Sequence, residues 1–272
     1  MVRMSRGVLF VSDLHIGSSV AMIPDNLRVY DGVVVRPSKA QRWIKSKWQD
    51  MISDVKKITN GMDLITVFNG DLIDGDHHGT YQLVTADQTE QARMCIEIIT
   101  PLVDMSSKTV FIRGTMSHVG REGRWDNLIS RNFDNVETFG TGETSHWHAD
   151  FEVDGVRFDV AHFSTQSGIA RNSGNAINQL AAETEFSYYR NGKKPPHYAI
   201  RSHRHIYKTS GDNFFTEAIQ TPAWQLGTSY VRSGANPNSL ADIGAVLIIC
   251  DNGKSEKIVF KHRPIVQKTI KI

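Results

Sequence analysis

Short apolar runs alternate with stretches of helical periodicity along the first half of the chain. Continuous apolar runs, typical of strands buried on both faces, occupy residues 8–11, 64–68 and 109–112. Between them, apolar residues recur at helical spacing over 39–58, where Ser38 is the predicted N-cap, and over 86–104. The order strand, helix, strand, helix, strand predicts a parallel sheet with crossover helices.

The pattern changes in the second half of the chain. Residues 151–158 alternate between apolar and polar around Asp154-Gly155, which predicts a β-hairpin. A helix is expected over 173–189. Further strands are expected over 197–200, 243–250 and 256–260. No internal repeat or linker interrupts the chain, so we expect one domain spanning residues 1–272.

Composition narrows the class of protein. The 40% hydrophobic fraction of the 272 residues is enough for a sizeable core, and the net charge of +2 gives no footprint for bulk binding of nucleic acid or membrane. Cys95 and Cys250 fit no metal or redox spacing, which indicates buried thiols in a reducing compartment. With no signal peptide and no run of membrane-spanning length, we expect a cytoplasmic protein, in the host cell if the gene belongs to a phage.

Five short segments rich in His and Asp follow predicted strands. They span residues 12–15, 69–75, 113–118, 161–162 and 202–205. Asp13, Asp71 and Gly114 come directly after the first three apolar runs, and ligands of open α/β sheets gather at that carboxyl edge. The irregular segment 16–37 is expected to be an active-site loop. Together the five segments hold enough carboxylate and imidazole for two divalent metals, an arrangement that hydrolyses phosphate esters.

Spacing assigns some of these residues to a shared site. Residues i and i+2 of an extended segment point the same way, so Asp13 and His15 are expected to reach one metal from one side. His203 and His205 have the same spacing after an apolar run. His162 lies at another strand end, although a lone histidine there is more often a hydrogen-bonded core residue than a ligand.

Other histidines compete with these candidates. His146 and His148 also have i, i+2 spacing, but they precede an alternating segment and are expected to face solvent, or substrate at most. His77 and His78 form a loop pair after the second motif. Of the two, His78 is our candidate for contact with the substrate.

The motifs resemble those of the calcineurin-like metallophosphoesterases, in particular the short phage and bacterial type. That family has Asp-x-His, Gly-Asp-x-x-Asp-Gly, Gly-Asn-His, a lone His and Gly-His-x-His in this order, and the resemblance covers residues 8–206. It implies an α/β fold in which a two-sheet β-sandwich is flanked by helices in four layers, α/β/β/α. It also implies a two-metal site.

The resemblance further implies a role for each matching residue. Asp13, His15 and His205 would hold one metal, and His162 and His203 the other. Asp71 would bridge the two metals. Asp74 would orient groups around the ligands, and we count it with the catalytic residues.

The third motif departs from the family pattern. The family has Asn and then His after the glycine, where this chain has Thr115 and Met116 after Gly114. Thr115 is our candidate for a neutral oxygen ligand in place of the Asn. His118 is our candidate for the acid that protonates the leaving group, because the glycine-containing loop after it is expected to let it swing inward. The alternative is that His118 is a solvated loop residue.

A function follows from the expected metals. Two ions would clamp a phosphate and activate a hydroxide for in-line attack. Imidazole ligands favour Mn²⁺, Fe, Zn²⁺, Co²⁺ or Ni²⁺ over Mg²⁺ or Ca²⁺, with Mn²⁺ our first choice.

Arginines near the motifs favour a polyanionic substrate, so we expect a phosphodiesterase or nuclease acting on nucleotides, DNA or RNA. These arginines are Arg113, Arg121, Arg124, Arg201 and Arg204, with Arg121 and Arg204 the preferred substrate contacts. The alternatives are solvated arginines, a phosphomonoesterase or protein phosphatase, and a non-catalytic scaffold that keeps the fold.

Overall fold

A computed structural model describes residues 5–29, 32–77, 79–164, 173–229, 231 and 240–264. His78 lies outside the described residues, so its expected contact with the substrate stays a prediction. None of the helices in these ranges is long and apolar enough to cross a membrane.

The first sheet is built on the three parallel strands that the apolar runs predict. Its order is β12-β11-β1-β4-β5, and β11 and β12 add an antiparallel edge. The strands are β1 (Arg6–Val11), β4 (Asp63–Asn69), β5 (Lys108–Ile112), β11 (Ile243–Asp251) and β12 (Lys254–His262). The crossovers are α1 (Lys39–Ile58) and α2 (Gln88–Asp104). Strand and helix types over this half of the chain are therefore confirmed.

The start of α1 shows why the sequence marks its first turn so clearly. Ser38 is the N-cap, and its Oγ accepts a hydrogen bond from the Gln41 amide at 3.2 Å. The Gln41 side chain accepts one in return from the Ser38 amide at 3.0 Å, which completes a capping box. The buried face of the helix carries Ile44, Trp48, Met51 and Val55 against the first sheet.

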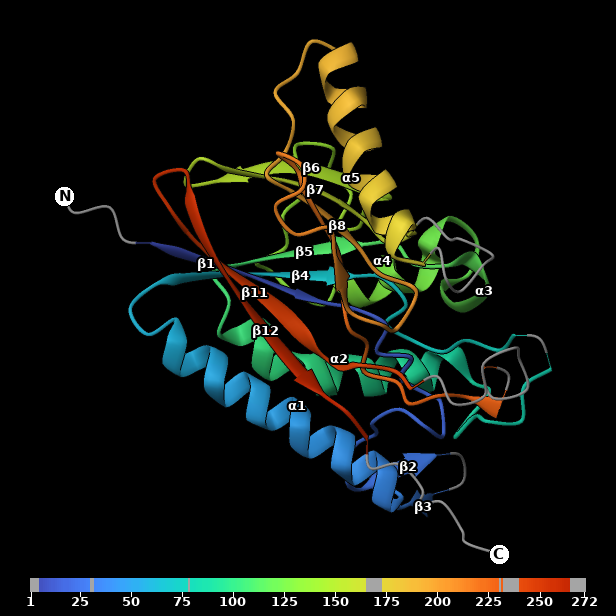
Figure 1. Ribbon diagram of the computed structural model, residues 1–272. Helices are drawn as coiled ribbons and strands as arrows, with labels where there is room; N and C mark the ends of the chain where they lie inside the picture. The colour runs from blue at the N-terminus through green and yellow to red at the C-terminus, as the bar shows by residue number, and fades with distance from the viewer. Residues whose placement is uncertain are drawn as a thin grey trace, which may run out of the picture.

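The second sheet has the order β6-β7-β8-β10-β9. Its strands are β6 (His148–Val153), β7 (Val156–Ala161), β8 (Tyr198–Arg201), β9 (Lys208–Thr209) and β10 (Glu217–Gln220). The turn at Asp154 and Gly155 joins β6 to β7 in the predicted hairpin. Helix α5 (Ser173–Arg190) lies on the outer face of this sheet (Figure 1).

Three separate apolar cores define the layers. One lies between α1, α2 and the first sheet; the second lies between the sheets, where Phe10 faces Phe158 with ring centroids 5.5 Å apart; the third lies under α5. The layers are thus helices, sheet, sheet and helix (Figure 1). The predicted α/β fold, a two-sheet sandwich flanked by helices, is confirmed.

Some local expectations are wrong. The segment 16–37 is not wholly irregular, because β2 (Leu27–Val29) and β3 (Val33–Val35) form a small antiparallel pair. The region after β5 is helical instead of an open loop. It contains α3 (Met116–Val119), the 3₁₀ turn η1 (Arg121–Gly123) and α4 (Arg124–Ser130). Short elements of this kind carry too few residues for a periodic signal.

Asp159 on β7 connects its strand to β6 and β8 of the second sheet and to α5. Its Oδ2 accepts hydrogen bonds from His148 Nε2 at 2.7 Å and from the Tyr188 hydroxyl at 3.0 Å. Its Oδ1 lies 2.6 Å from an Arg201 nitrogen. Burial alone would raise the pKa of Asp159, but these partners lower it to about 2.

The low pKa of Asp159 predicts a pH-dependent contribution to stability. A carboxyl with a depressed pKa stabilises the folded protein fully above its ordinary pKa near 4, and that contribution is lost as pH falls toward about 2. Asp159→Asn should therefore lower the free energy of unfolding by roughly 2 kcal/mol at pH 7 and by about half as much at pH 3. Urea denaturation of both proteins at the two pH values measures this. Equal differences at both pH values would show that the Asp159 charge is not responsible.

Candidate metal centre

The carboxyl ends of β1 and β4 deliver two buried aspartates to one place. The loops that follow these strands are joined by backbone hydrogen bonds, from the Asp13 amide to the Gly70 carbonyl and from the His15 amide to the Asp71 carbonyl, each 3.0 Å. The Trp224 amide donates to the Asp13 carbonyl at 3.0 Å, which brings in the segment after β10. Asp13 and Asp71 therefore lie together at the strand ends, as the sequence predicts. The backbone hydrogen bonds hold their loops in register.

The backbone of five motif residues is left-handed. The φ angles are 53° at Asp13, 46° at His15, 52° at Asp71, 73° at His203 and 56° at His205. Only nine non-glycine residues of the described chain have positive φ, and these are five of them. The expectation that each i, i+2 pair shares a direction because its segment is extended is therefore wrong. Such strained positions cluster at functional sites, where the surroundings hold them in place.

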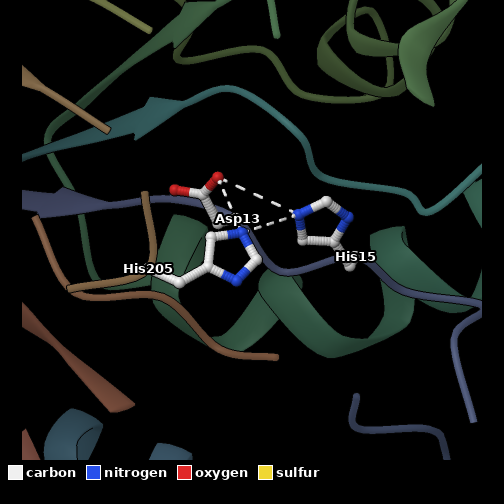
Figure 2. A group of neighbouring side chains, drawn as sticks. All are labelled: Asp13, His15 and His205. Atoms are coloured by element: carbon white, nitrogen blue, oxygen red, sulfur yellow. Dashed lines mark hydrogen bonds and ion pairs between the residues drawn. The ribbon is translucent and has the colours of Figure 1, made fainter. Parts of the chain in front are cut away.

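Asp13, His15 and His205 form the first ligand group (Figure 2). His205 Nε2 lies 3.3 Å from Asp13 Oδ1 and 3.2 Å from His15 Nε2. Asp13 is fully buried, and its Oδ1 has no hydrogen-bond partner among the described residues. Two imidazole nitrogens and an unsatisfied carboxylate oxygen thus face one point, which is the donor set that a divalent transition metal takes.

Asp74 orients the first group from behind. Its Oδ1 lies 3.0 Å from His15 Nδ1, so the His15 ring presents Nε2 to the cluster. The Gln225 side chain donates to the same Asp74 oxygen at 3.2 Å. Burial opposes the charge of Asp74, yet the hydrogen bond from His15 keeps its pKa well below the usual value. Gln225 carries no motif signal, and sequence reasoning missed it.

Asp71, His162 and His203 form the second ligand group. His162 Nδ1 donates to the Asn69 carbonyl at 2.7 Å, which leaves Nε2 facing Asp71 Oδ2 at 3.0 Å. His203 Nδ1 lies 4.0 Å from the same oxygen. Asp71 also groups with His15 and His118, whose nitrogens lie within 4.8 Å of its carboxylate. Asp71 therefore stands between the two groups.

Thr115 occupies the place of the missing Asn. Its amide donates to Asp71 Oδ1 at 2.6 Å, and its hydroxyl donates to Asp71 Oδ2 at 3.0 Å. The same hydroxyl lies 3.4 Å from His162 Nε2 and 3.2 Å from His203 Nδ1. A neutral oxygen thus lies in the middle of the second group.

Glycine is required where the strand ends approach most closely. A Cβ at Gly114 would overlap the backbone and carboxylate of Asp71, and a Cβ at Gly70 would overlap the His162 ring. Gly70 also has a φ of +84°. These glycines let the ligands of β4 and β5 lie side by side.

The pKa shifts of the buried aspartates and histidines show that the site stabilises positive charge. Burial would raise the pKa of Asp13, but the charge of His205 lowers it to about 2. Burial would lower the pKa of His162, but the charge of Asp71 and its hydrogen bond raise it to about 10. Protons on imidazoles thus offset the buried carboxylates in the absence of other cations. The residues present therefore fit divalent metal ions, which would take over that role.

His118 is held in position more firmly than the sequence suggests. It lies on the one-turn helix α3, where Nδ1 donates to the Asp74 carbonyl at 2.6 Å. Its ring meets those of His15 and His77 edge-on, with centroids 4.5 and 4.2 Å away. The expectation of a permissive loop that swings His118 inward is wrong, because the residue already lines the cleft. Burial lowers its pKa to about 4.

A cleft of about 790 Å³ opens over both groups. Arg204 lines it, and no hydrogen bond or ion pair engages its guanidinium within the described ranges. Arg121 is exposed on η1 and does not contribute to the described lining.

The other candidates near the motifs are engaged elsewhere. Arg113 pairs with Glu143, Arg201 pairs with Asp159, and Arg124 lies over the Trp125 ring. His148 pairs with Asp159 on the second sheet, and neither it nor His146 is among the described residues that line the cleft. His77 does line the cleft, 3.6 Å from Asp74.

Comparison with known proteins finds no matching family model and no match among curated protein sequences. Among solved structures, vacuolar protein sorting 29 from Cryptosporidium parvum is 9% identical, with a TM-score of 0.47 over 96% of this chain and 100% of that one. A dimetal phosphatase from Danio rerio is 9% identical, with a TM-score of 0.42 over 93% and 98%. A metallophosphoesterase from Sphaerobacter thermophilus is 9% identical, with a TM-score of 0.37 over 96% and 89%.

The structure combines the motif order of the sequence with two packed sheets and two adjoining ligand groups. The two packed sheets with outer helices match the arrangement that the motif resemblance implies. Because the TM-scores are below 0.5 and the identities near a tenth, the function has to be argued from the site itself.

Asp126 is a further residue that the motifs do not reveal. It is fully buried on α4, and its Oδ2 accepts a hydrogen bond from the Gly114 amide at 2.8 Å. That bond fixes the Arg113–Gly114 peptide, one residue before Thr115. Asp126 therefore positions the oxygen at the centre of the second group without touching that group's carboxylate.

This arrangement predicts a selective effect on the second metal. Asp126→Ala should weaken binding of one of two Mn²⁺ ions by roughly 10- to 100-fold, as loss of an indirect partner does. Asp126→Asn should retain affinity, because its amide oxygen still accepts from Gly114. Isothermal titration with Mn²⁺, beside thermal unfolding of each variant, measures this. Equal weakening of both ions by the Ala variant, at unchanged stability, would contradict the assignment.

Proposed function

We propose that this chain is a metal-dependent phosphoesterase that uses two divalent ions, with Mn²⁺ as the first candidate. The observation that carries the proposal is the convergence of Asp13, Asp71 and four histidines into two adjoining ligand groups under one open cleft. Carboxylate and imidazole in this ratio suit Mn²⁺, Fe, Zn²⁺, Co²⁺ or Ni²⁺. A single structural histidine or aspartate would not need this convergence.

Each ligand group would hold one ion. Asp13, His15 and His205 would hold the first, and His162, His203 and Thr115 the second, with Asp71 shared between them. When bound, such a pair of ions polarises a phosphoryl oxygen and lowers the pKa of bound water. Asp74 would hold His15 in the tautomer whose Nε2 is free to bind, since its carboxylate meets Nδ1.

Two residues of the chain would act on the ester itself. Arg204 lines the cleft and has no partner among the described residues, so its guanidinium is available to a phosphate oxygen. His118 keeps its Nδ1 proton on the Asp74 carbonyl, which leaves Nε2 for a second proton. The negative charge of a bound phosphate would favour that second proton, and His118 could then pass it to the departing oxygen.

We further propose phosphodiesters of nucleotides or nucleic acids as the substrates. The open cleft and Arg204, which no described residue engages, support an anionic substrate larger than inorganic phosphate. Phosphomonoesters and phosphoproteins are the alternatives, and turnover on bis(p-nitrophenyl) phosphate against p-nitrophenyl phosphate separates diesters from monoesters.

A non-catalytic scaffold is a second candidate. It is favoured by one observation, the replacement of the Asn-His pair by Thr115 and Met116 after Gly114. Thr115 nevertheless lies within hydrogen-bond distance of both histidines of the second group. A scaffold would turn over no ester at any metal concentration, which a diester panel with Mn²⁺ and with chelator tests directly.

The proposed function makes a prediction about the shared residue Asp71. Asp71→Asn should reduce hydrolysis of the best substrate by more than the ~100-fold that loss of an indirect partner costs, since it weakens both metal groups together. The metal content of protein purified with Mn²⁺, near two per chain for the unaltered protein, should fall as well. Asp54→Asn on the exposed face of α1 is the matched control. Unchanged turnover in the Asp71 variant would remove Asp71 from the shared position.

The proposed function also makes a prediction about proton delivery by His118. His118→Ala should lower turnover by roughly 10²- to 10⁴-fold for a diester with a poor leaving group, and much less for p-nitrophenyl esters, whose leaving group needs little protonation. Metal content should stay at the unaltered level. His146→Ala, outside the described lining of the cleft, is the control. Equal losses on both classes of ester would indicate a positioning or metal role instead.

A further inference from the structure

The cleft has a neutral wall beyond the two ligand groups. Two segments form this wall, residues 79–82 and 225–229, and both contribute lining residues. Its polar side chains are Thr80, Gln82, Gln225, Thr228 and Ser229. All of these are uncharged donors and acceptors, which suit the edges of a base or the hydroxyls of a sugar.

Hydrogen bonds hold the two segments of the neutral wall in place. The Ser229 amide donates to Gln82 Oε1 at 2.6 Å, which joins one segment to the other. The Ser19 amide donates to the Gln82 carbonyl at 2.7 Å, and the Leu226 amide donates to the Val20 carbonyl at 3.0 Å. Both segments are therefore tied to the loop that follows the first metal motif, at a fixed distance from the ligands.

Tyr81 stands at the mouth of the cleft. Its relative exposure is 100%, although it lines the cleft, and no contact to its ring or hydroxyl is found among the described residues. A large aromatic ring left without packing beside a catalytic cleft offers both faces to a ligand. Stacking on a nucleic-acid base is the interaction for which such a ring is suited.

The charge of the cleft limits the size of the ligand. Of the described residues that line it, Arg204 alone carries a permanent positive charge. Proteins that follow a polynucleotide backbone use a groove with several cations, one for each phosphate neutralised. The net charge of +2 adds no wider basic surface. The single guanidinium of Arg204 beside the two ligand groups suits a molecule with one or two phosphates.

From the neutral wall, the exposed ring and the single cation, we propose that the cleft binds a small nucleoside phosphodiester. The scissile phosphate would lie over the ligand groups, the base would stack on Tyr81, and the nucleoside hydroxyls would meet Gln82, Thr228 and Ser229. This inference rests on the proposed phosphoesterase function, and it narrows the substrate class to a mononucleotide ester.

Two esters that differ only in the nucleoside test the proposal. Thymidine 5′-(p-nitrophenyl phosphate) and methyl p-nitrophenyl phosphate release the same leaving group, so the ratio of their kcat/KM values reports the nucleoside alone. Tyr81→Ala should lower that ratio roughly 5- to 150-fold, the worth of one base–aromatic stack. Tyr81→Phe should keep the ratio. Tyr189→Ala, an exposed tyrosine on α5, is the control.

A binding measurement separates this inference from the proposed function. Isothermal titration of Mn²⁺-loaded protein with thymidine 5′-phosphate and with methyl phosphate should show tighter binding of the nucleotide, lost in Tyr81→Ala. If neither ester is hydrolysed but this binding difference is seen, the phosphoesterase fails and the nucleoside subsite stands. If the esters are hydrolysed with a ratio that Tyr81→Ala leaves unchanged, the subsite is wrong.

Length dependence decides between a mononucleotide ester and a polymer. kcat/KM for single-stranded oligothymidylates of 2 and 20 nucleotides, expressed per phosphodiester bond, should not rise with length. It should also change little between 50 and 200 mM salt, since few phosphates are neutralised. A steep rise with length together with a steep fall with salt would overturn the proposal in favour of a polynucleotide.

Discussion

Asp13, Asp71 and Asp74 lie close together and almost wholly out of contact with water. Buried carboxylates this near one another repel, and each loses hydration that nothing apolar replaces. The surrounding structure offsets this with imidazoles from three separate segments, so His15, His162 and His205 lie within about 4 Å of a carboxylate oxygen. Because the three carboxylates need positive charge beside them, the loops that carry these histidines have to lie against the loops that carry the aspartates.

The fold meets that need by using both sheets. β1, β4 and β5 of the first sheet end at one edge and supply the carboxylates and Thr115, whereas the segments after β7 and β8 of the second sheet supply His162 and His203. Asn69 connects the two, since its side chain donates to the Ala161 carbonyl and to the Ser202 hydroxyl at 3.1 and 2.6 Å. The site thus forms only when the sandwich closes, and neither sheet holds a complete ligand group of its own.

The sequence predicted well what depends on period and on strand ends. Apolar runs located β1, β4 and β5, and the predicted N-cap Ser38 located the start of α1, because each signal is local. The six motif residues proposed as ligands follow predicted strands in the same way, and the structure brings them together in two groups. Gln225 and Asp126 were not found from the sequence, because their roles arise from contacts across 151 and 12 positions that no local pattern records. His118 was found, but its anchoring on the Asp74 carbonyl depends on α3, a helix too short to leave a periodic trace.

The left-handed backbone at the ligands limits which side chains each position accepts. Asp, Asn and His are the non-glycine residues that enter this conformation most readily, whereas β-branched residues are excluded from it. Exchange between Asp, Asn and His at residues 13, 15, 71, 203 and 205 would therefore change the ligands of the proposed metal centre while leaving the chain path intact. Few side chains are therefore accepted at these five positions. His162 and Thr115 are not among the left-handed residues, so a wider choice of side chains is open there to laboratory evolution toward another metal.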